Sequence, residues 1–137
     1  MRFVDTSVLL YAISRDPAEQ DKAKRANDLL GERDLALSVQ VLQEFYVQAT
    51  HGRRSDRLTY EQAAGLVDSF RRFPVQDTTV GLALAAMDAS RRFQVSYWDA
   101  AILEAARLLG CEVVLSEDLA DGRDYGGVRV INPLRGF

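Results

Sequence analysis

Four acidic residues of this chain each lie close to the end of a predicted strand or the start of a predicted helix: Asp5, Glu44, Asp99 and Asp118. Carboxylates that converge on one site repel one another unless they are protonated or neutralised, and a divalent cation is an economical way to neutralise them. Because the available donors are oxygen atoms, such a site favours a hard ion. The pattern therefore predicts a site for Mg²⁺ or Mn²⁺.

The other reactive residues exclude several kinds of catalytic site. His51 is the one His and Cys111 the one Cys in 137 residues. These leave too few soft ligands for zinc, and one His cannot supply the paired imidazoles of a metal-free ribonuclease. Cys111 has apolar neighbours, which indicate a buried and inert thiol. Chemistry in this chain must therefore rely on carboxylates and hydroxyls.

Each acid also has an ordinary structural explanation. Asp5 could cap a helix, and Asp99 could complement the dipole of a first helical turn. Asp118 could form an Asx turn, and Glu44 could be a solvated helix position. Aromatic or aliphatic residues directly adjoin Glu44 and Asp99, which is not typical of a solvated face. The metal site is therefore the interpretation that we carry forward.

The elements that must position these acids alternate between short apolar strands and longer amphipathic helices. Strands are predicted over residues 2–4, 35–37, 73–75, 113–115 and 128–131. Helices are predicted over about 6–13, 18–30, 39–50, 60–72, 80–93 and 97–109. This alternation is typical of an α/β fold, in which a mainly parallel sheet is covered by helices on both faces. Ligands of such sheets bind beyond the carboxyl ends of the strands.

Local signals refine the helices. Thr6 or Ser7 is expected to cap the first helix, and Ser96 is expected to cap the last one. The helix over 39–50 is expected to turn four residues towards the core: Leu42, Phe45, Tyr46 and Ala49.

Length and composition limit the class of protein. A chain of 137 residues fits one core, so we treat residues 1–137 as a single domain. With 47% hydrophobic and 27% charged residues, the chain is typical of a globular protein rather than a disordered or membrane one. No apolar run approaches the roughly 20 residues that span a bilayer, and no leader-like segment follows Met1. We therefore expect a cytoplasmic protein without a membrane partner.

The net charge of −3 argues against a nucleic-acid binder that relies on a broad basic surface. Only Lys22 and Lys24 are Lys, so almost all the cations are Arg. Guanidinium groups bind phosphate bidentately, although codon bias in a GC-rich genome would also favour Arg.

Four segments, taken in order, resemble the motifs of PIN-domain nucleases, and in particular those of VapC-type ribonuclease toxins from bacterial toxin–antitoxin pairs. They are residues 5–10 (DTSVLL), 38–45 (SVQVLQEF), 97–102 (YWDAAI) and 115–119 (LSEDL). The resemblance implies a three-layer α/β/α sandwich in which the first and fourth strands are neighbours.

The resemblance also implies roles for individual residues. Asp5 and Asp99 match the most direct metal ligands, and Glu44 and Asp118 match acids that complete the cluster directly or through water. Glu117 competes with Asp118 for the last position. Ser7 and Ser116 match hydroxyl positions that orient metal-bound water or phosphate.

The implied activity is that of a Mg²⁺-dependent endoribonuclease which hydrolyses phosphodiester bonds of a structured RNA, such as tRNA or rRNA, with water as the nucleophile. The implied partners are a second copy of the chain and a cognate antitoxin that covers the active site. Candidate antitoxin contacts lie on the first helix: Leu9, Leu10 and Tyr11.

Candidate RNA contacts lie mainly in one basic loop: Arg53, Arg54 and Arg57. Weaker candidates are the pairs Arg71–Arg72 and Arg91–Arg92, for which solvated Arg side chains at helix ends are the favoured explanation. His51 is expected to cap its helix rather than to touch RNA. Trp98 could stack on a base, but packing of the helix start against the core is the favoured explanation.

Other classes of protein fit less well. A receiver-like phosphoacceptor module would also place acids at this edge of a sheet, but it needs a Lys late in the chain, and no Lys follows Lys24. A DNA flap nuclease would need additional duplex-binding elements. A non-catalytic, metal-binding PIN-like or interaction module stays open as the alternative.

Overall fold

The computed structural model describes residues 1–137, and its centre is one sheet of five strands in the order β3-β2-β1-β4-β5. The strands are β1 (Arg2–Val4), β2 (Leu35–Ser38), β3 (Val75–Gln76), β4 (Val113–Leu115) and β5 (Arg129–Ile131). Every neighbouring pair is parallel. The predicted α/β class with a parallel sheet is therefore confirmed.

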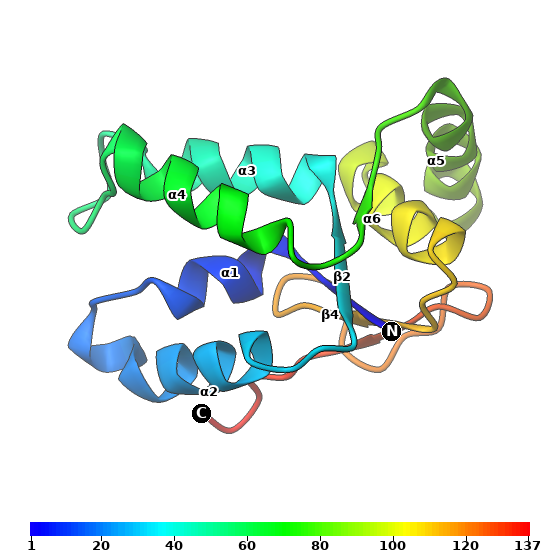
Figure 1. Ribbon diagram of the computed structural model, residues 1–137. Helices are drawn as coiled ribbons and strands as arrows, with labels where there is room; N and C mark the ends of the chain where they lie inside the picture. The colour runs from blue at the N-terminus through cyan, green and yellow to red at the C-terminus, as the bar shows by residue number, and fades with distance from the viewer.

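Six helices connect the first four strands, because parallel strands cannot be joined by a tight turn, and a loop connects β4 to β5. They are α1 (Thr6–Ala12), α2 (Gln20–Leu30), α3 (Val39–Ala49), α4 (Tyr60–Phe70), α5 (Val80–Phe93) and α6 (Tyr97–Leu108). Figure 1 shows α1 to α4 on one side of the sheet and α5 and α6 on the other, which confirms the three-layer arrangement. None of these helices has the length and apolar character needed to cross a membrane.

The pairing of β1 with β4 sets the position of the site. Val4 lies opposite Leu115, and the backbone N–H of Asp5 donates to the carbonyl oxygen of Leu115 at 3.0 Å. The first residues beyond the two strands, Asp5 and Ser116, are thereby brought side by side. This confirms that the first and fourth strands are neighbours.

The strands are short but deeply buried, because helices cover both faces of the sheet. Phe3, Leu37 and Val114 have no exposed surface. Between α3 and α4, the rings of Phe45 and Phe70 meet edge to face at 5.2 Å. This core holds the strand ends, and therefore the residues that follow them, in fixed positions.

Several local predictions need correction. Asp5, rather than Thr6 or Ser7, caps α1, because its side chain accepts from the Thr6 N–H. A 3-10 turn (Pro17–Glu19) precedes α2, since Pro17 favours the first turn of a helix and not its interior. The third strand lies later than predicted, at Val75–Gln76.

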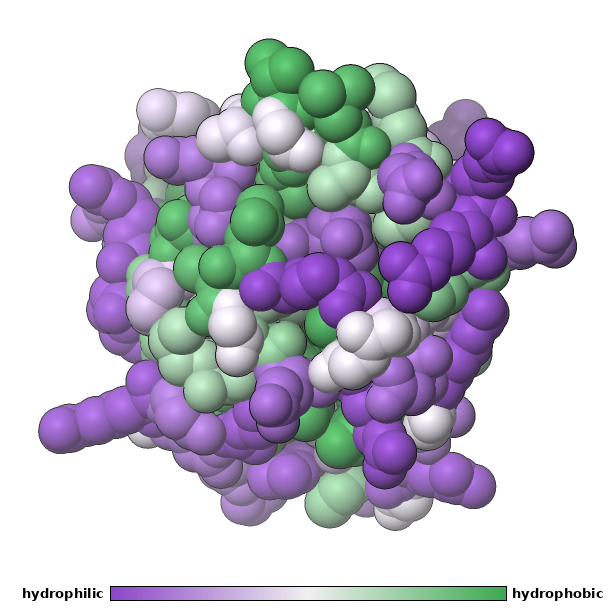
Figure 2. All heavy atoms as spheres, turned by 90° about the vertical axis from the view of Figure 1, so that its right-hand side faces the viewer, coloured by the Kyte–Doolittle hydropathy of each residue, from purple (hydrophilic) through white to green (hydrophobic).

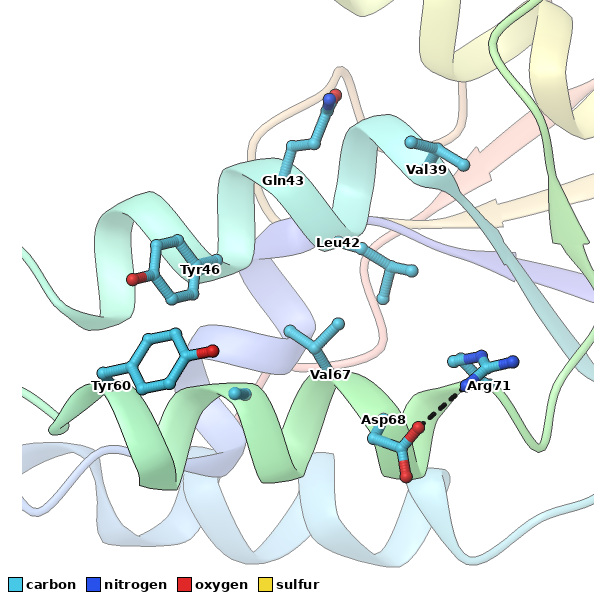
Figure 3. Close-up of a pocket in the computed structure, with 9 residues that line it drawn as sticks. Val39, Leu42, Gln43, Tyr46, Tyr60, Val67, Asp68 and Arg71 are labelled. Atoms are coloured by element: carbon cyan, nitrogen blue, oxygen red, sulfur yellow. Dashed lines mark hydrogen bonds and ion pairs between the residues drawn. The ribbon is translucent and has the colours of Figure 1, made fainter.

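The predicted core face of α3 is only partly correct. Phe45 and Ala49 are buried, as is Val41, which the sequence pattern did not select. Leu42 is half-buried and packs against the core, whereas Tyr46 is exposed, and both residues line an apolar groove between α3 and α4 (Figure 3). The reason is that α4 packs beside α3 and leaves the groove between them open to solvent.

Candidate active site

The carboxyl ends of β1 and β4 lie beside a small pocket whose lining includes all four predicted acids: Asp5, Glu44, Asp99 and Asp118. Asp5 directly follows β1, and Asp118 follows β4 after two further residues. Glu44 lies in the second turn of α3, and Asp99 lies in the first turn of α6. The structure thus gathers side chains that are up to 113 residues apart, since residues 5 and 118 are the extremes.

Asp5 is the most constrained of the four acids, with only 8% of its surface exposed. One carboxylate oxygen accepts from the Thr6 N–H at 2.8 Å, and the other accepts from the Ser116 hydroxyl at 2.7 Å. Burial raises the pKa of Asp5 to about 6 in spite of these hydrogen bonds, and the charges of Asp118 and Glu44 act in the same direction as burial. The fold therefore holds a carboxylate where ionisation is costly.

Glu44 is oriented by two neighbours within the pocket. Its Oε1 accepts from the Thr6 hydroxyl at 3.2 Å and from the Gln40 side-chain amide at 3.3 Å. Burial raises the pKa of Glu44, and the charges of Asp99 and Asp118 add to that effect. Thr6 and Gln40 are site residues that the sequence reasoning missed. Their signal was position, because each lies within one helical turn of a selected acid.

Asp118 and Glu117 are separated by their partners, although they are adjacent in sequence. Burial raises the pKa of Asp118, and so do the charges of Glu117 and Asp99. Glu117 accepts instead from Tyr11 Oη at 2.6 Å and from Lys22 Nζ at 2.9 Å. Burial opposes ionisation of Glu117, but those two hydrogen bonds outweigh it and lower the pKa. Asp118 lines the pocket, and Glu117 does not.

The two selected serines fasten the loop after β4. The Ser116 hydroxyl donates to Asp5 and accepts from the backbone N–H groups of Asp118 and Leu119 at 3.1 and 3.2 Å. Ser7 Oγ accepts from the Glu117 N–H at 3.1 Å and also lines the pocket. These bonds hold α1 and the β4 loop together, so the distance between Asp5 and Asp118 does not depend on a flexible connection.

The chemistry of the donor set fits a hard divalent cation. None of the ion pairs in the structure includes any of the four acids. No three of the acids lie close enough together to hold a metal ion by themselves. Mg²⁺ usually retains several waters and takes only one or two carboxylates, so an ion held here would be partly hydrated.

A second, more polar pocket adjoins the acids. It shares four lining residues with the acid pocket: Ser7, Leu10, Gln48 and Asp118. Arg54 also lines it and forms an ion pair with Asp56 at 2.8 Å. The two pockets therefore adjoin each other, with Arg54 in the lining of the polar pocket and Trp98 in the lining of the acid pocket.

The other residues of the basic loop are placed differently. Arg57 donates to the carbonyl oxygen of Gly52 at 3.1 Å. Arg53 is exposed, and its backbone N–H donates to His51 Nδ1 at 3.1 Å. His51 therefore hydrogen-bonds within the loop, whereas we expected it to cap the helix. Of the three selected Arg residues, only Arg54 lines a pocket with one of the acids.

Two predictions about apolar residues are wrong. Trp98 does not pack into the core; it is 65% exposed and lines the acid pocket. Leu9 is completely buried and cannot contact a partner protein. Both errors concern amphipathic helix starts, where periodicity does not say which neighbouring element covers a side chain.

A largely apolar pocket, lined by none of the four acids, lies between α3 and α4 (Figure 3). Its one carboxylate, Asp68, is paired with Arg71 at 2.9 Å, so it offers no reactive group. Figure 2 shows hydrophobic residues also gathered at the top of another face, where α5 lies. Exposed residues of that helix are Val80, Leu84 and Met87.

Comparison with known proteins gives one family and several similar structures. The PIN domain matches residues 2–120. The VapC20 toxin of Mycobacterium tuberculosis, described as cleaving the sarcin-ricin loop, is 21% identical, with a TM-score of 0.67 over 86% of this chain and 90% of that one. A toxin–antitoxin complex from Klebsiella pneumoniae is 19% identical, with a TM-score of 0.69 over 97% of this chain and 98% of that one.

A third similar structure is DNA-bound VapBC from Salmonella typhimurium, which is 21% identical, with a TM-score of 0.64 over 94% of this chain and 95% of that one. No curated protein sequence matches the chain. The family match includes all four acids, and the structural matches share the fold over nearly the whole chain. The chain belongs to the PIN domain family.

Proposed function

We propose that this chain is a divalent-metal-dependent endoribonuclease toxin that hydrolyses phosphodiester bonds of a structured RNA, with tRNA or rRNA as the expected class. One observation carries the proposal: four carboxylates from separate elements line one pocket, and no cationic side chain pairs with them. A protein gains nothing in stability from such an arrangement. It is explained if a cation, Mg²⁺ or alternatively Mn²⁺, completes the site. PIN-domain nucleases generally use divalent metal ions, which supports this reading.

In the proposed mechanism, Asp5 and Asp99 are the direct ligands, and Glu44 and Asp118 act directly or through water. When bound, the ion neutralises these charges, activates water and stabilises charge on the phosphodiester. Asp5 is suited to its role because two hydrogen bonds fix its orientation. Asp99 lies at the N-terminus of α6, where the helix dipole favours a negative charge.

The hydroxyl groups around the acids orient the reacting groups. Ser7 on α1 and Ser116 after β4 are proposed to position the loop that follows β4. Ser7 also lines the pocket in which a phosphate oxygen would lie. Thr6 keeps Glu44 turned towards the other acids. Because the nucleophile is water, cleavage should leave a 5′-phosphate and a 3′-hydroxyl.

RNA contacts in this proposal come from the loop that carries Arg53, Arg54 and Arg57. Arg54 is the strongest candidate of the three, because it lines the polar pocket that adjoins the acid pocket. A guanidinium there can bind a phosphate next to the scissile one. Arg53 and Arg57 would contribute longer-range attraction that weakens with salt.

The proposed partners are a cognate antitoxin and a second copy of the chain. Support comes from the similar structures, several of which are complexes of a toxin with its antitoxin. Leu10 and Tyr11 remain candidate contacts, because both are partly exposed at the polar pocket. An RNA target of this class would place the activity in the cytoplasm.

The alternative is a non-catalytic, metal-binding or receiver-like module. A receiver-like reaction needs a free Lys beside the acids, whereas Lys22 is held by Glu117 and no Lys follows Lys24. Metal binding without catalysis is separated from the proposal only by an assay for cleavage.

In the deciding experiment, the chain is expressed and the new RNA ends in the cell are mapped. We expect cleavage at defined sites with 5′-phosphate ends, lost in Asp5→Asn. Asp88→Asn is the matched control, because Asp88 is an exposed acid on α5 away from the pocket. Equal cleavage by Asp5→Asn, or cyclic phosphate ends that persist after chelation, would refute the mechanism.

A further inference from the structure

Trp98 is the one large aromatic side chain on the rim of the acid pocket. Its indole is large and mostly apolar, yet 65% of its surface is accessible to solvent. The pocket lining includes Trp98 together with Asp99 and Glu44. Solitary exposed apolar residues are common, but this one lies beside the proposed reactive centre rather than on a remote face.

The local structure presents the indole on a rigid support. Ser96 caps α6 and fixes the helix start, since its hydroxyl accepts from the Asp99 N–H at 3.1 Å. The ring of Tyr97 meets the indole edge to face at 4.9 Å and 85°. The side-chain amide of Gln40 donates both to the Trp98 carbonyl oxygen at 3.2 Å and to Glu44. The backbone of Trp98 is thereby linked to one of the acids.

We infer that Trp98 is a stacking platform for an unpaired nucleobase adjacent to the phosphodiester that lies in the acid pocket. This inference rests on the proposed nuclease function and adds the form of the substrate to it. An indole face binds any base by stacking and does not require a particular hydrogen-bond pattern. Bases inside a duplex have both faces covered by their neighbours, so the segment that binds must be a loop, a bulge or a single strand.

The two connected pockets also suggest the course of the strand. Trp98 lines the acid pocket, and Arg54 lines the adjoining one, with Asp118 common to both. A strand that crosses this groove would place a base on Trp98, the reacting phosphate over the acids and a flanking phosphate near Arg54. Sequence tolerance at the stacked base follows, because every base has a π-face.

A cationic side chain of a protein partner is the competing occupant, since an indole beside carboxylates also attracts Arg. The base is favoured because the adjoining pocket contains Arg54, whose guanidinium has further N–H donors for a phosphate beside its ion pair with Asp56. The two occupants give different results in one assay.

Trp98 is the only Trp in the chain, so its fluorescence reports this position alone. The probe is a ten-nucleotide single-stranded RNA added with Mg²⁺ to the intact chain carrying Asp5→Asn, which prevents cleavage. We expect saturable quenching by the single strand, and quenching at least several-fold weaker by the same RNA annealed to its complement. An Arg-containing peptide that quenches when RNA does not would overturn the inference.

Binding of labelled RNA supplies the second measurement. Trp98→Ala should weaken binding of the single strand about tenfold, and Trp98→Phe should restore most of it. Leu84→Ala is the matched control, because Leu84 lies on α5 and is exposed to a similar extent, at 60%. An abasic nucleotide at the stacked position should weaken wild-type binding and make the Trp98→Ala change nearly silent.

The outcomes separate the inference from the function beneath it. Metal-dependent cleavage that Trp98→Ala leaves unchanged in both KM and kcat would overturn the stacking role alone. Quenching and tenfold weaker binding in a chain that never cleaves RNA would overturn the nuclease and retain the platform. Absence of RNA binding by the unmodified chain would overturn both.

Discussion

Glu117 and Asp118 are adjacent acids with opposite electrostatic environments. Glu117 is the more buried, at 21% side-chain exposure, yet its pKa is lowered because Tyr11 and Lys22 outweigh the cost of burial. Asp118 is an exposed residue, yet its pKa is raised. Partial burial of its carboxylate is the main cause, and the negative charges of Glu117 and Asp99 add to it. Burial by itself therefore does not distinguish a structural carboxylate from a functional one. The partners do.

The same contrast holds for the two regions around these residues. In the first, the ammonium of Lys22 pairs with Glu117 and lies 5.0 Å from the centre of the Tyr11 ring, so its charges and hydrogen bonds are satisfied within the protein. In the second, the acid pocket, hydroxyls and amides orient the carboxylates, but nothing neutralises them. The first region is satisfied without a ligand, whereas the proposed function assigns a cation to the second.

The largest expected effect is loss of cleavage in Asp5→Asn. Removing the charge of Asp5, the proposed metal ligand, should lower the rate by roughly 10³-fold or more, because a bound ion would supply several kcal/mol of transition-state stabilisation. Cleavage of a purified RNA target in Mg²⁺ is the measurement, with Asp88→Asn alongside. A loss of less than about tenfold would mean that Asp5 belongs with Glu117 as a structural acid.

The matched pair Asp118→Asn and Glu117→Gln tests the contrast directly. Asp118→Asn should reduce cleavage about 10- to 100-fold with little change in unfolding free energy, since its partners are other acids. Glu117→Gln should lower stability by about 1 kcal/mol and leave the rate within a few-fold. Urea unfolding and cleavage are measured on both proteins. A reversal of the two results would assign Glu117 to the site.

Stability of the metal-free protein should depend on pH in the direction set by Asp5. Its pKa of about 6 in the folded state lies above its usual value of 3.8, so the folded state binds a proton more tightly than the unfolded state does. The stabilisation that comes from this tighter proton binding is complete below pH ~3.8 and is lost as pH rises through about 6. Lowering the pH from 7.5 to 5 should therefore stabilise the protein by on the order of 1–2 kcal/mol.

Two comparisons check that assignment in thermal unfolding. Asp5→Asn should flatten the pH dependence, and Mg²⁺ at pH 7.5 should stabilise the wild type more than the variant. A wild-type protein that loses stability between pH 7.5 and pH 5 would contradict the raised pKa.

The smallest effect is expected on the compensated side, in Lys22→Met. Loss of the cation leaves Glu117 with Tyr11 alone, and should cost about 0.5–1 kcal/mol because both charges are partly solvated. Lys24→Met is the control, since Lys24 pairs with Asp28 on the exposed surface of α2. Cleavage should stay within a few-fold of wild type. A large loss of activity would show that the Lys22 cluster acts on the reaction.

Much of this organisation could be predicted from local patterns. Alternation of apolar strands and amphipathic helices identified β1, β2 and β4 within one residue, and the Ser96 cap begins α6 where expected. The four acids were selected because they stand at element ends. The exposed Trp98 and the groove at Leu42 and Tyr46 could not be predicted, because a helix pattern gives the apolar face but not which neighbour covers it.

By itself, the sequence determined the types of element, the parallel α/β class and the acids available at the strand and helix ends, because these depend on periodicities and caps within a few residues. The tertiary structure alone decided which acids are compensated. Lys22 reaches Glu117 across 95 positions, and Ser116 reaches Asp5 across 111. Such pairs depend on strand register and helix packing, and they separate Asp118, which is left without a cation, from its neighbour Glu117, which has one.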